Sequence, residues 1–412
     1  MPRKQERVVK LYFLFVLSFQ LWIEETTEMA PVTSSSQAQQ DQVLEEEVSY
    51  VRILSLNRPR QLNALSFQMI SRLLELFQRY EHDSNVKLVI VKGIGRAFSA
   101  GGDVLGVVHA VKQSDWRSGA KFFYDEFFLN YLMATYTKPQ VSILNGIVMG
   151  GGCGVSIHGR FRIATENSVF AMPETALALF PDVGASYFLS RLPGFFGEYL
   201  ALTGARLDGA EMLACGLATH FVPSSRLSLL EETLCKVASS DTAIVSAIID
   251  KFSQQPCLKD SSAYHRMDVI DKCFSRRTVE EIVSALEREN INRLDAWISS
   301  TIELLRKASP ISLKITLRSI REGRLQGVGQ CLIREYRMVC HVLRGEVSKD
   351  LFEGCRAILI DKDKNPKWEP SKLELVSESM VDQFFSKVSD EEWEDLKLPA
   401  RSNLPDFAIA KL

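Results

Sequence analysis

A glycine run that follows a short apolar segment restricts the fold of this 412-residue chain more than any other feature. Residues 145–154 read NGIVMGGGCG, so three consecutive glycines, Cys153 and a further glycine come directly after apolar residues. Glycine loses more backbone freedom on folding than any other residue, and a run of it weakens a helix or strand that contains it. The run therefore predicts a place where bare backbone must approach another group closely.

Four interpretations of this run compete. A phosphate-binding P-loop needs a lysine and a hydroxyl residue after its last glycine, but Val155 and Ser156 follow Gly154, and GGGCG does not match the dinucleotide fingerprint G-x-G-x-x-G. Cys153 as a nucleophile would need a nearby base, and a cysteine between glycines is more typical of tight packing. The fourth interpretation is an oxyanion hole, in which exposed N–H groups at a helix start face developing negative charge.

An oxyanion hole holds its oxygen better with two converging donors than with one, and the sequence offers a second candidate. Residues 95–103 read GRAFSAGGD, another predicted strand that ends in a glycine turn. Asp103 is placed to interact with the N-terminus of a following helix. Two such turns, each after a predicted strand, favour the oxyanion-hole interpretation.

The first half of the chain predicts strands that alternate with helices. Apolar or alternating residues predict strands at 48–59, 87–93 and 140–146, and a pair of strands within 160–174. Ser66 is a suitable N-cap for a helix whose apolar side chains then follow at helical spacing. Alternation of this kind through about residue 230 predicts a layered α/β fold.

The second half of the chain changes to helical patterns. Thr278 and Glu281 predict a capping box at the start of a helix over 278–289. Another helix is predicted over 309–323, with Ser309 as its cap, a proline in its first turn and a glycine as its stop.

Charge and cysteine usage narrow the classes of partner and cofactor. The formal net charge of −2 provides no overall field that would attract nucleic acid or an anionic membrane, so neither is expected as a partner. The eight cysteines are scattered without a C-x-x-C pair, which predicts reduced thiols and neither a disulfide framework nor a zinc site. The six histidines form no H-E-x-x-H motif. We therefore expect no metal.

The two ends of the chain carry conflicting targeting patterns. Residues 1–23 have the basic head and apolar middle of a signal peptide, but the apolar stretch is too short to span a bilayer and no small-residue cleavage site follows. We interpret residues 1–28 as an extension outside the fold, with Met29 as an alternative start. The final Ala410-Lys411-Leu412 is close to the S-K-L signal, which predicts a peroxisomal location and the peroxisomal import receptor as a partner.

These patterns divide the chain into three parts. Residues 1–44 form the extension and a polar lead-in, residues 45–235 form the α/β core, and residues 236–412 form a mainly helical C-terminal region that ends in the targeting tripeptide.

Four segments of the core, taken in order, are similar to the motifs of a known superfamily. NRPRQLNALS (57–66), GRAFSAGGD (95–103), NGIVMGGGCG (145–154) and MPETALALFPDVGASYFLSRL (172–192) resemble those of the crotonase, or enoyl-CoA hydratase/isomerase, superfamily. GVSIHGRFRIATEN, GCRAILIDKDKNPKWEP and the final AKL carry a finer likeness to the branch that hydrolyses 3-hydroxyisobutyryl-CoA, particularly its plant peroxisomal form. This finer likeness covers nearly all of residues 40–412.

The resemblance implies a spiral of ββα units, followed here by the mainly helical C-terminal region. It implies an acyl-CoA substrate whose thioester carbonyl lies between the N–H groups of Gly102 and Gly151, so the bare glycines would let the thioester oxygen reach the backbone. No cofactor is implied, because coenzyme A belongs to the substrate. Members of the superfamily commonly form trimers through C-terminal helices, and a homo-oligomer stays open for this chain.

The chain departs from the hydratase pattern at one position that bears on the reaction. Hydratases of the superfamily place one glutamate just after the GGG run and a second in a P-E motif, whereas this chain has Gly154 at the first position and Glu174 at the second. The resemblance thus implies thioester hydrolysis in valine breakdown, with Glu174 as the attacking group or as the base for water. Asp182 and Glu126 match pocket positions of the hydrolase branch, and Asp182 would accept a hydrogen bond from the 3-hydroxyl of the substrate.

The proposed site residues also have plainer interpretations. Glu174 follows a proline and could cap a helix, and Asp182 follows another and could be an ordinary turn residue. Glu126 has Asp125 beside it, and such an acidic pair could be a solvated helix face.

Other residues are expected to have no part in the chemistry. His158, within GVSIHG, lacks the last glycine of a serine-hydrolase nucleophile elbow, so we expect a packed or surface histidine. By family analogy Arg58 could contact coenzyme A, and the arginines within 317–327 could hold its phosphates. An arginine beside a proline usually faces solvent, and solvent exposure is the default expectation for both. Two rival functions stay open: an enoyl-CoA hydratase or isomerase, which Gly154 disfavours, and a non-catalytic scaffold that retains the fold.

Overall fold

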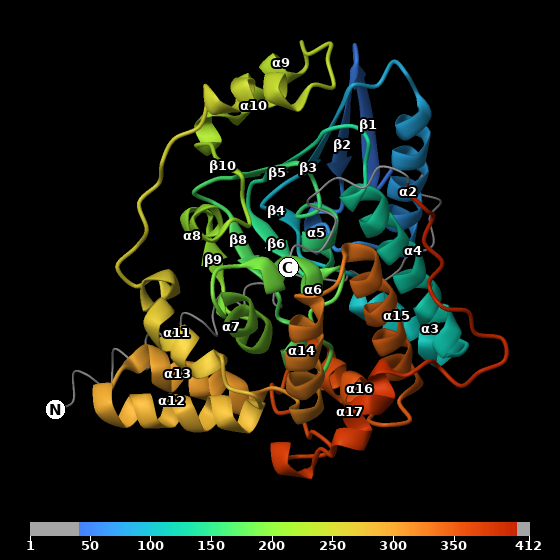
Figure 1. Ribbon diagram of the computed structural model, residues 1–412. Coiled ribbons are helices and arrows are strands. Elements are labelled where there is room, and N and C mark those ends of the chain that lie inside the picture. Colours follow the sequence, from blue (N-terminus) through green and yellow to red (C-terminus); the bar gives the residue numbers. More distant parts are fainter. Residues whose placement is uncertain (1–40, 402–412) are drawn as a thin grey trace.

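The computed structural model describes residues 41–401, which form two sheets surrounded by helices (Figure 1). The larger sheet has the strand order β1-β2-β3-β5-β7-β10, in which β1 and β2 are antiparallel and the other neighbours are parallel. The smaller sheet has the order β4-β6-β8-β9, with β8 and β9 antiparallel. The strands are β1 Val43–Val48, β2 Val51–Leu56, β3 Leu88–Gly93, β4 Ala97–Ser99, β5 Gln140–Leu144, β6 Ile147–Met149, β7 Phe161–Ala164, β8 Val169–Ala171, β9 Leu207–Asp208 and β10 His220–Phe221.

Consecutive strands of the core enter different sheets. β3, β5 and β7 belong to the larger sheet, and β4, β6 and β8, which follow them in turn, belong to the smaller one. The β5–β6 connection needs a glycine, because Gly146 has a φ of +100° and a side chain there would collide with the Arg96 carbonyl. The two strands predicted within 160–174 are present, but the prediction that they form a pair is wrong, because β7 pairs with β5 and β10 while β8 pairs with β6 and β9.

The larger sheet is buried on both faces, which accounts for the nearly continuous apolar runs of its parallel strands. Side chains that alternate along β2 and β3 point to opposite faces, so one set packs beneath α9 and α10 and the other joins the main core. The set beneath α9 and α10 includes Val51, Ile53, Leu88 and Ile90, and the set in the main core includes Leu54, Leu56, Val89 and Val91.

Helices follow the strand pairs and then form the C-terminal region. The prediction that Ser66 caps the first helix of the core is confirmed, since its hydroxyl accepts a hydrogen bond from the Met69 amide at 3.2 Å. The helices are α2 Phe67–His82, α3 Val104–Gln113, α4 Trp116–Ala134, α5 Gly151–Gly154, α6 Ala185–Phe188, α7 Phe196–Thr203, α8 Gly209–Cys215, α9 Leu227–Leu234, α10 Thr242–Asp250, α11 Met267–Phe274, α12 Val279–Arg293, α13 Ala296–Lys307, α14 Pro310–Gly323, α15 Val328–Arg344, α16 Asp350–Cys355 and α17 Glu378–Phe385. Shorter helical turns are η1 Pro59–Gln61, η2 Glu174–Leu177, η3 Leu189–Arg191, η4 Ser224–Arg226, η5 Ala263–Arg266, η6 Arg356–Ile360 and η7 Leu373–Leu375.

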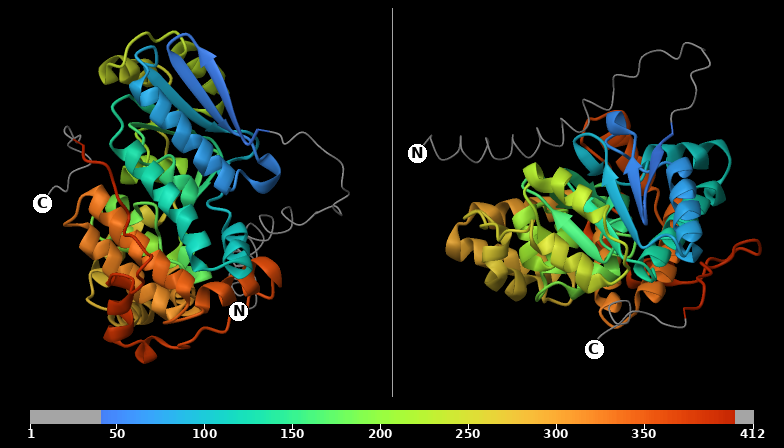
Figure 2. Two further views of the ribbon diagram at one scale, coloured as in Figure 1. Left: turned by 90° about the vertical axis from the view of Figure 1, so that its right-hand side faces the viewer. Right: turned by 90° about the horizontal axis from the view of Figure 1, so that it is seen from above.

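The C-terminal helices pack directly on the core. α14 contacts α6 and α7, and α15 contacts the long helix α4. In Figure 2 (left) these helices, coloured orange to red, lie together on the side of the core away from the hairpin β1–β2. The C-terminal region therefore forms one wall of the core.

Two local helix predictions for this region need correction. Thr278 accepts a hydrogen bond from the Glu281 amide, but the Glu281 carboxylate accepts from the Arg277 amide, so only half of the predicted capping box forms. Ser309 and Pro310 begin α14 as predicted, whereas Gly323 is the last helical residue and not a stop beyond the helix.

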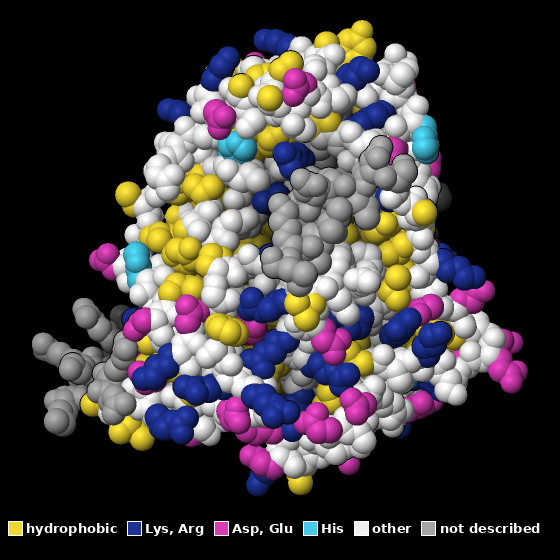
Figure 3. Space-filling view, viewed as in Figure 1, with side chains coloured by type: hydrophobic (Ala, Val, Ile, Leu, Met, Phe, Trp, Pro, Cys, Tyr) yellow, Lys and Arg dark blue, Asp and Glu magenta, His cyan; other side chains and the backbone are white. Residues whose placement is uncertain are grey.

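The arginines within 317–327 do more than face solvent. Arg318 pairs with Glu322 and Asp382, and the buried carboxylate of Glu198 accepts two hydrogen bonds from Arg324 at 2.9 Å each. Basic and acidic side chains accordingly lie interspersed over the lower part of the molecule in Figure 3, where the C-terminal helices lie. The prediction of purely solvent-facing arginines is therefore wrong.

Residues 1–28 and Ala410-Lys411-Leu412 lie outside the described residues, so the predictions about them stay predictions, as does the division at residue 235. Between residues 41 and 401, none of the helices has the length and apolar character needed to cross a membrane.

Candidate active site

The two glycine turns that were predicted to supply oxyanion donors lie side by side. They follow β4 and β6, which are parallel neighbours in the smaller sheet, so both turns emerge at the same sheet end. A Cβ built on Gly151 would lie only 3.0 Å from the Gly102 amide nitrogen. Among the loop and turn hydrogen bonds of residues 41–401, neither the Gly102 amide nor the Gly151 amide has a backbone acceptor. The fold thus brings two available N–H groups together at the start of α5.

Positive φ angles make glycine necessary at two of these positions. Gly101 has a φ of +111° and Gly150 has a φ of +48°, which other residues adopt only with strain. A Cβ on Gly101 would also lie 3.3 Å from the Met149 carbonyl oxygen. The bare backbone of both turns is therefore required by their close approach to each other.

Two of the predicted carboxyl side chains face this pair of amides. A Cβ on Gly151 would lie 2.5 Å from Glu126 Oε1, and one on Gly150 would lie 2.9 Å from Glu174 Oε1. Glu126 comes from α4, whereas Glu174 begins the short turn η2 after β8. Glu126 Oε1 and Glu174 Oε2 are buried and have no hydrogen-bond partner within the described chain.

The third predicted carboxyl, Asp182, lies close enough to the other two to affect their ionisation. Burial raises the pKa of Glu174 well above its usual value, and the charge of Asp182 and then that of Glu126 add to the increase. Burial likewise raises the pKa of Glu126, with Asp182 adding to it, and burial followed by the charge of Glu335 raises the pKa of Asp182. Because neighbouring carboxylates disfavour double ionisation, one member of the Glu126–Asp182 pair can donate a hydrogen bond while the other accepts.

The turn that carries Asp182 is held by two residues whose function the sequence did not indicate. Val183 has a φ of +53°, a strained conformation for a β-branched residue. The Glu335 carboxylate, from α15, accepts hydrogen bonds from the Gly184 amide at 2.7 Å and from the Ser186 amide at 3.0 Å. His158 Nε2 lies 2.8 Å from the Val183 carbonyl oxygen and donates to it. These contacts hold the residues that directly follow Asp182 and thereby restrict its position.

The prediction that His158 is packed rather than catalytic agrees with its surroundings. Burial lowers its pKa to about 4, so the imidazole is neutral at physiological pH, and its ring packs edge-on against Phe188. Glu335 lies in an ordinary amphipathic helical pattern, so the residues of α15 carry no sequence signal for its role at the Asp182 turn. Its contacts with residues about 150 positions earlier are visible only in the folded chain.

Gly154, which stands where hydratases carry a glutamate, has no room for a side chain. A Cβ there would lie 2.7 Å from Val183 Cβ and 2.8 Å from Asn130 Nδ2. The difference from the hydratase pattern therefore extends beyond one residue, since Val183 and Asn130 crowd the position where the side chain of a glutamate would begin.

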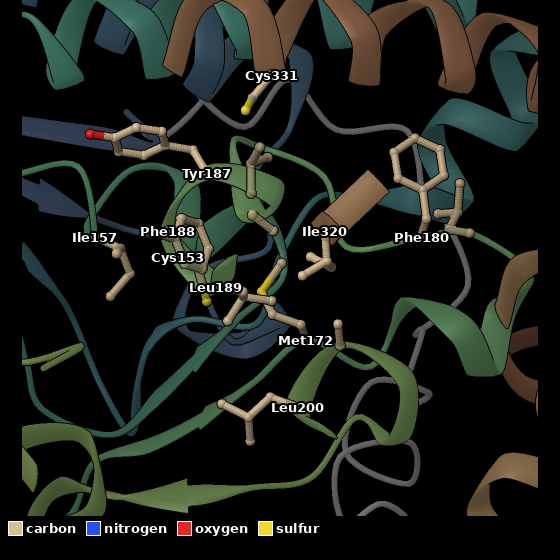
Figure 4. Close-up of a cluster of buried hydrophobic side chains, with 14 of the residues drawn as sticks. Cys153, Ile157, Met172, Phe180, Tyr187, Phe188, Leu189, Leu200, Ile320 and Cys331 are labelled. Atoms are coloured by element: carbon tan, nitrogen blue, oxygen red, sulfur yellow. The ribbon is translucent and has the colours of Figure 1, made fainter. Parts of the chain in front are cut away.

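The interpretation of Cys153 as a nucleophile is excluded by its surroundings. The thiol is buried among apolar side chains that include Met172, Phe188 and Leu189 (Figure 4). Its Sγ atom donates weakly to the Val148 carbonyl at 3.5 Å, and burial raises the pKa of the thiol well above its usual value. The Cys153 side chain thus points from α5 into the apolar core, as the flanking glycines indicated.

The acidic pair on α4 divides between surface and interior. Asp125 forms an ion pair with Lys121 on the surface, while Glu126 is 1% exposed. The solvated-face interpretation therefore applies to Asp125 alone.

Arg58 was expected to face solvent, but it donates to the Ala64 carbonyl at 2.6 Å and pairs with Asp103, which caps α3. These contacts of Arg58 therefore stabilise the first glycine turn, which ends at Asp103.

Comparison with known proteins places this arrangement in a family. Residues 51–385 match the family model described as enoyl-CoA hydratase/isomerase. The chain is 72% identical over 375 residues to 3-hydroxyisobutyryl-CoA hydrolase 1 of Arabidopsis thaliana, a match that covers 91% of this chain and 99% of the relative. It is 44% identical to small ribosomal subunit protein mS47 of the same plant, over 92% of this chain and 93% of that protein.

A solved structure agrees with the fold. The carnitinyl-CoA dehydratase of Mycobacterium thermoresistibile superposes with a TM-score of 0.79 at 35% identity, covering 88% of this chain and all of the other. A spiral of strand pairs and helices with two facing glycine turns is the crotonase type of fold, so the predicted fold class is confirmed. The chain belongs to the enoyl-CoA hydratase/isomerase family.

Proposed function

We propose that the protein is an acyl-CoA thioesterase that hydrolyses 3-hydroxyisobutyryl-CoA to 3-hydroxyisobutyrate and coenzyme A. The observation that carries this proposal is the buried Glu174 beside two facing glycine amides, with a crowded Gly154 at the position where a hydratase would carry its other catalytic glutamate. The 72% identity to an Arabidopsis protein named for this reaction supports the same choice of substrate.

In the proposed reaction, the N–H groups of Gly102 and Gly151 bind the thioester oxygen and stabilise the negative charge that develops on it. Stabilisation of this kind by one donor is typically worth about 3–4 kcal/mol of barrier. Glu174 either attacks the carbonyl carbon, giving an anhydride that water opens, or removes a proton from the attacking water. Either way the carbon–sulfur bond breaks, one water is consumed, and the thiol leaves with a proton. Side chains, backbone amides and water suffice for this route, so no cofactor is proposed.

Asp182 and Glu126 are proposed to select a hydroxylated acyl group. Burial and the charge of Asp182 raise the pKa of Glu126, so a protonated Glu126 would donate a hydrogen bond where Asp182 accepts one, which is the complement of a hydroxyl group. A buried site built to bind a hydroxyl discriminates against an acyl chain that lacks it by several powers of ten, because its polar groups would then be left unpaired.

Two rival functions have relatives of their own. The dehydratase whose structure superposes on this chain favours the hydratase alternative, but the packing around Gly154 opposes it. The similarity to a protein named as a ribosomal component favours a scaffold. Against the scaffold stand the buried, unpartnered oxygens of Glu126 and Glu174, which destabilise a chain that does not use them.

The cellular setting is proposed from the sequence. Ala410-Lys411-Leu412 would bind the peroxisomal import receptor and direct the enzyme to peroxisomes, where the reaction would serve valine breakdown. A homo-oligomer is compatible with this proposal but is not required by it.

The first test is thiol release from 3-hydroxyisobutyryl-CoA by the purified full-length chain, with crotonyl-CoA hydration measured in parallel. Release that is lost in a Glu174→Gln variant whose melting temperature is not lowered, together with negligible hydration, is the expected result. Hydration without release would assign the protein to the hydratases, and inactivity on both esters would favour the scaffold.

The two roles of Glu174 can be separated in one turnover with excess enzyme in water labelled with oxygen-18. If Glu174 is the nucleophile, water that attacks the glutamyl carbonyl of the anhydride leaves label in the glutamate side chain. If Glu174 is the base, all of the incorporated label is in the free acid. Mass spectrometry of the peptide that contains Glu174 distinguishes these outcomes.

A further inference from the structure

Asn130 on α4 is a buried polar side chain without a partner. It is 0% exposed, and neither Nδ2 nor Oδ1 has a hydrogen-bond partner in the described part of the chain. Leaving a buried polar group unpaired costs about 1–3 kcal/mol, so an apolar side chain of the same size would serve packing better. Such a residue requires an explanation other than stability.

The position of Asn130 connects it with the proposed site. It follows Glu126 by one helical turn, so both side chains project from the same face of α4 toward α5. A Cβ on Gly151, at the start of α5, would lie 2.5 Å from Glu126 Oε1. A Cβ on Gly154, at the end of α5, would lie 2.8 Å from Asn130 Nδ2 and 3.1 Å from its Oδ1.

The Cβ position of Gly154 is bounded on its other side by the turn that carries Asp182. Val183 Cβ lies 2.7 Å from the Cβ position of Gly154, so Asn130 faces the residue next to Asp182 across the glycine. Three side chains around α5 thus have buried, unpartnered polar atoms: Glu126, Asn130 and Glu174. Buried atoms of this kind, gathered around one short helix, indicate a polar ligand between them.

The chemistry of the amide defines what it can bind. Asn130 offers two N–H donors and one carbonyl acceptor, which together complement an O–H group. An amide cannot take up the proton of that group, so it can orient the group without competing with Glu174 as a base.

We propose that Asn130 binds an O–H group at the reaction centre, on the side of α5 where hydratases carry their first carboxylate. This inference rests on the proposed function. The O–H group has two sources, the 3-hydroxyl of the acyl chain and the hydrolytic water, and both make the same hydrogen bonds to the amide.

The test uses an Asn130→Leu variant of the full-length chain, with Gln140→Leu as a matched control. Gln140 is also a buried amide whose Oε1 has no partner among the described residues, but its Nε2 donates to Ser142 Oγ at 3.0 Å and to the Val155 carbonyl at 3.1 Å, so only Asn130 has neither amide atom paired. We expect Gln140→Leu to lower the melting temperature and to retain the kcat of the folded protein. Asn130→Leu is expected to leave the melting temperature unchanged or raised, and to lower kcat/KM for 3-hydroxyisobutyryl-CoA by about ten- to a hundredfold.

Isobutyryl-CoA, which lacks the hydroxyl, identifies the source of the O–H group. Loss on the hydroxylated ester alone assigns Asn130 to the 3-hydroxyl, and equal loss in kcat on both esters assigns it to the water. Activity within twofold of wild type on both esters overturns the proposal. A fall in melting temperature like that of Gln140→Leu also overturns it, because Asn130 would then be structural.

Failure of the proposed function would be visible separately, as wild-type protein that releases no thiol from either ester. The inference would then be decided by calorimetric binding of 3-hydroxybutyryl-CoA and butyryl-CoA. A preference for the hydroxylated ester that Asn130→Leu abolishes supports it, and a preference that the substitution leaves unchanged overturns it.

Discussion

Replacement of Gly151 by alanine tests the oxyanion hole most directly, because the glycine contributes only its backbone. The added Cβ would lie 3.0 Å from the Gly102 amide nitrogen and 2.5 Å from Glu126 Oε1. An oxyanion must itself lie about 2.7–3.1 Å from each donor, so the methyl group intrudes at the distance that the oxygen needs. We expect loss of about one donor, or about 3–4 kcal/mol, which lowers kcat on the order of 10²- to 10³-fold.

The substitution will also cost stability, because the methyl group crowds Glu126, and overpacking of this kind typically costs about 1–3 kcal/mol. Gly216→Ala is the matched control for that loss. Gly216 has a φ of +86° at the end of α8, and a Cβ there would meet nothing within 4 Å, so alanine costs about 1–2 kcal/mol through backbone strain alone.

Both variants would be compared by thiol release at saturating 3-hydroxyisobutyryl-CoA and by urea unfolding. The control is expected to lose stability and to keep its turnover. If the kcat of Gly151→Ala is within tenfold of the kcat of Gly216→Ala, the assignment of the Gly151 amide to the oxyanion hole is refuted.

Three further predictions follow from the same contacts. Gly154→Glu will destabilise the fold by about 1–3 kcal/mol in urea unfolding and will not create crotonyl-CoA hydration, because its Cβ meets Val183 at 2.7 Å; measurable hydration would contradict this. Glu335→Ala leaves two buried amide donors of the Asp182 turn unpaired, at a cost of about 1–3 kcal/mol each. Both the melting temperature and the preference for 3-hydroxyisobutyryl-CoA over isobutyryl-CoA should therefore fall. An unchanged preference would show that the turn does not position Asp182. Burial raises the pKa of Glu174, so thiol release should increase as pH rises above the usual carboxyl range. The unfolding free energy should fall over the same interval because the folded state binds the extra proton. The stability of Glu174→Gln relative to wild type should therefore increase as pH rises above that range, and a constant difference would argue against the raised pKa.

The parts of the site that the sequence predicted are those whose physical requirement is local. A glycine run after an apolar strand and a serine at a helix start each restrict their immediate neighbours, so a short pattern carries the information. The roles of Glu126, Glu174 and Asp182 were predicted from the family resemblance and not from a local pattern. The two glycine turns could be connected because each follows a strand, and parallel strands present their ends at one edge of a sheet.

The parts that the sequence did not predict depend on contacts between distant segments. Glu335 lies about 150 residues after the turn that it holds, and the amphipathic pattern of α15 is the same whether such a glutamate faces solvent or a buried amide. Asn130 gave no signal for a similar reason, because the lack of a partner is a property of its surroundings. The assignment of β7 and β8 to different sheets also depends on pairing partners and not on their own residues.

The energetic character of the site supports an enzyme over a scaffold. Buried carboxyls with unpartnered oxygens, an unpartnered amide at Asn130 and a valine in a left-handed conformation each lower the stability of the folded chain. A chain selected only for its shape would gain stability by replacing them with apolar residues of similar volume. Their concentration around α5, where two amides also lack acceptors, is what chemistry on a polar ligand requires, and the C-terminal helix α15 contributes to it through Glu335. The C-terminal region therefore belongs to the site, since it holds the turn from which Asp182 projects.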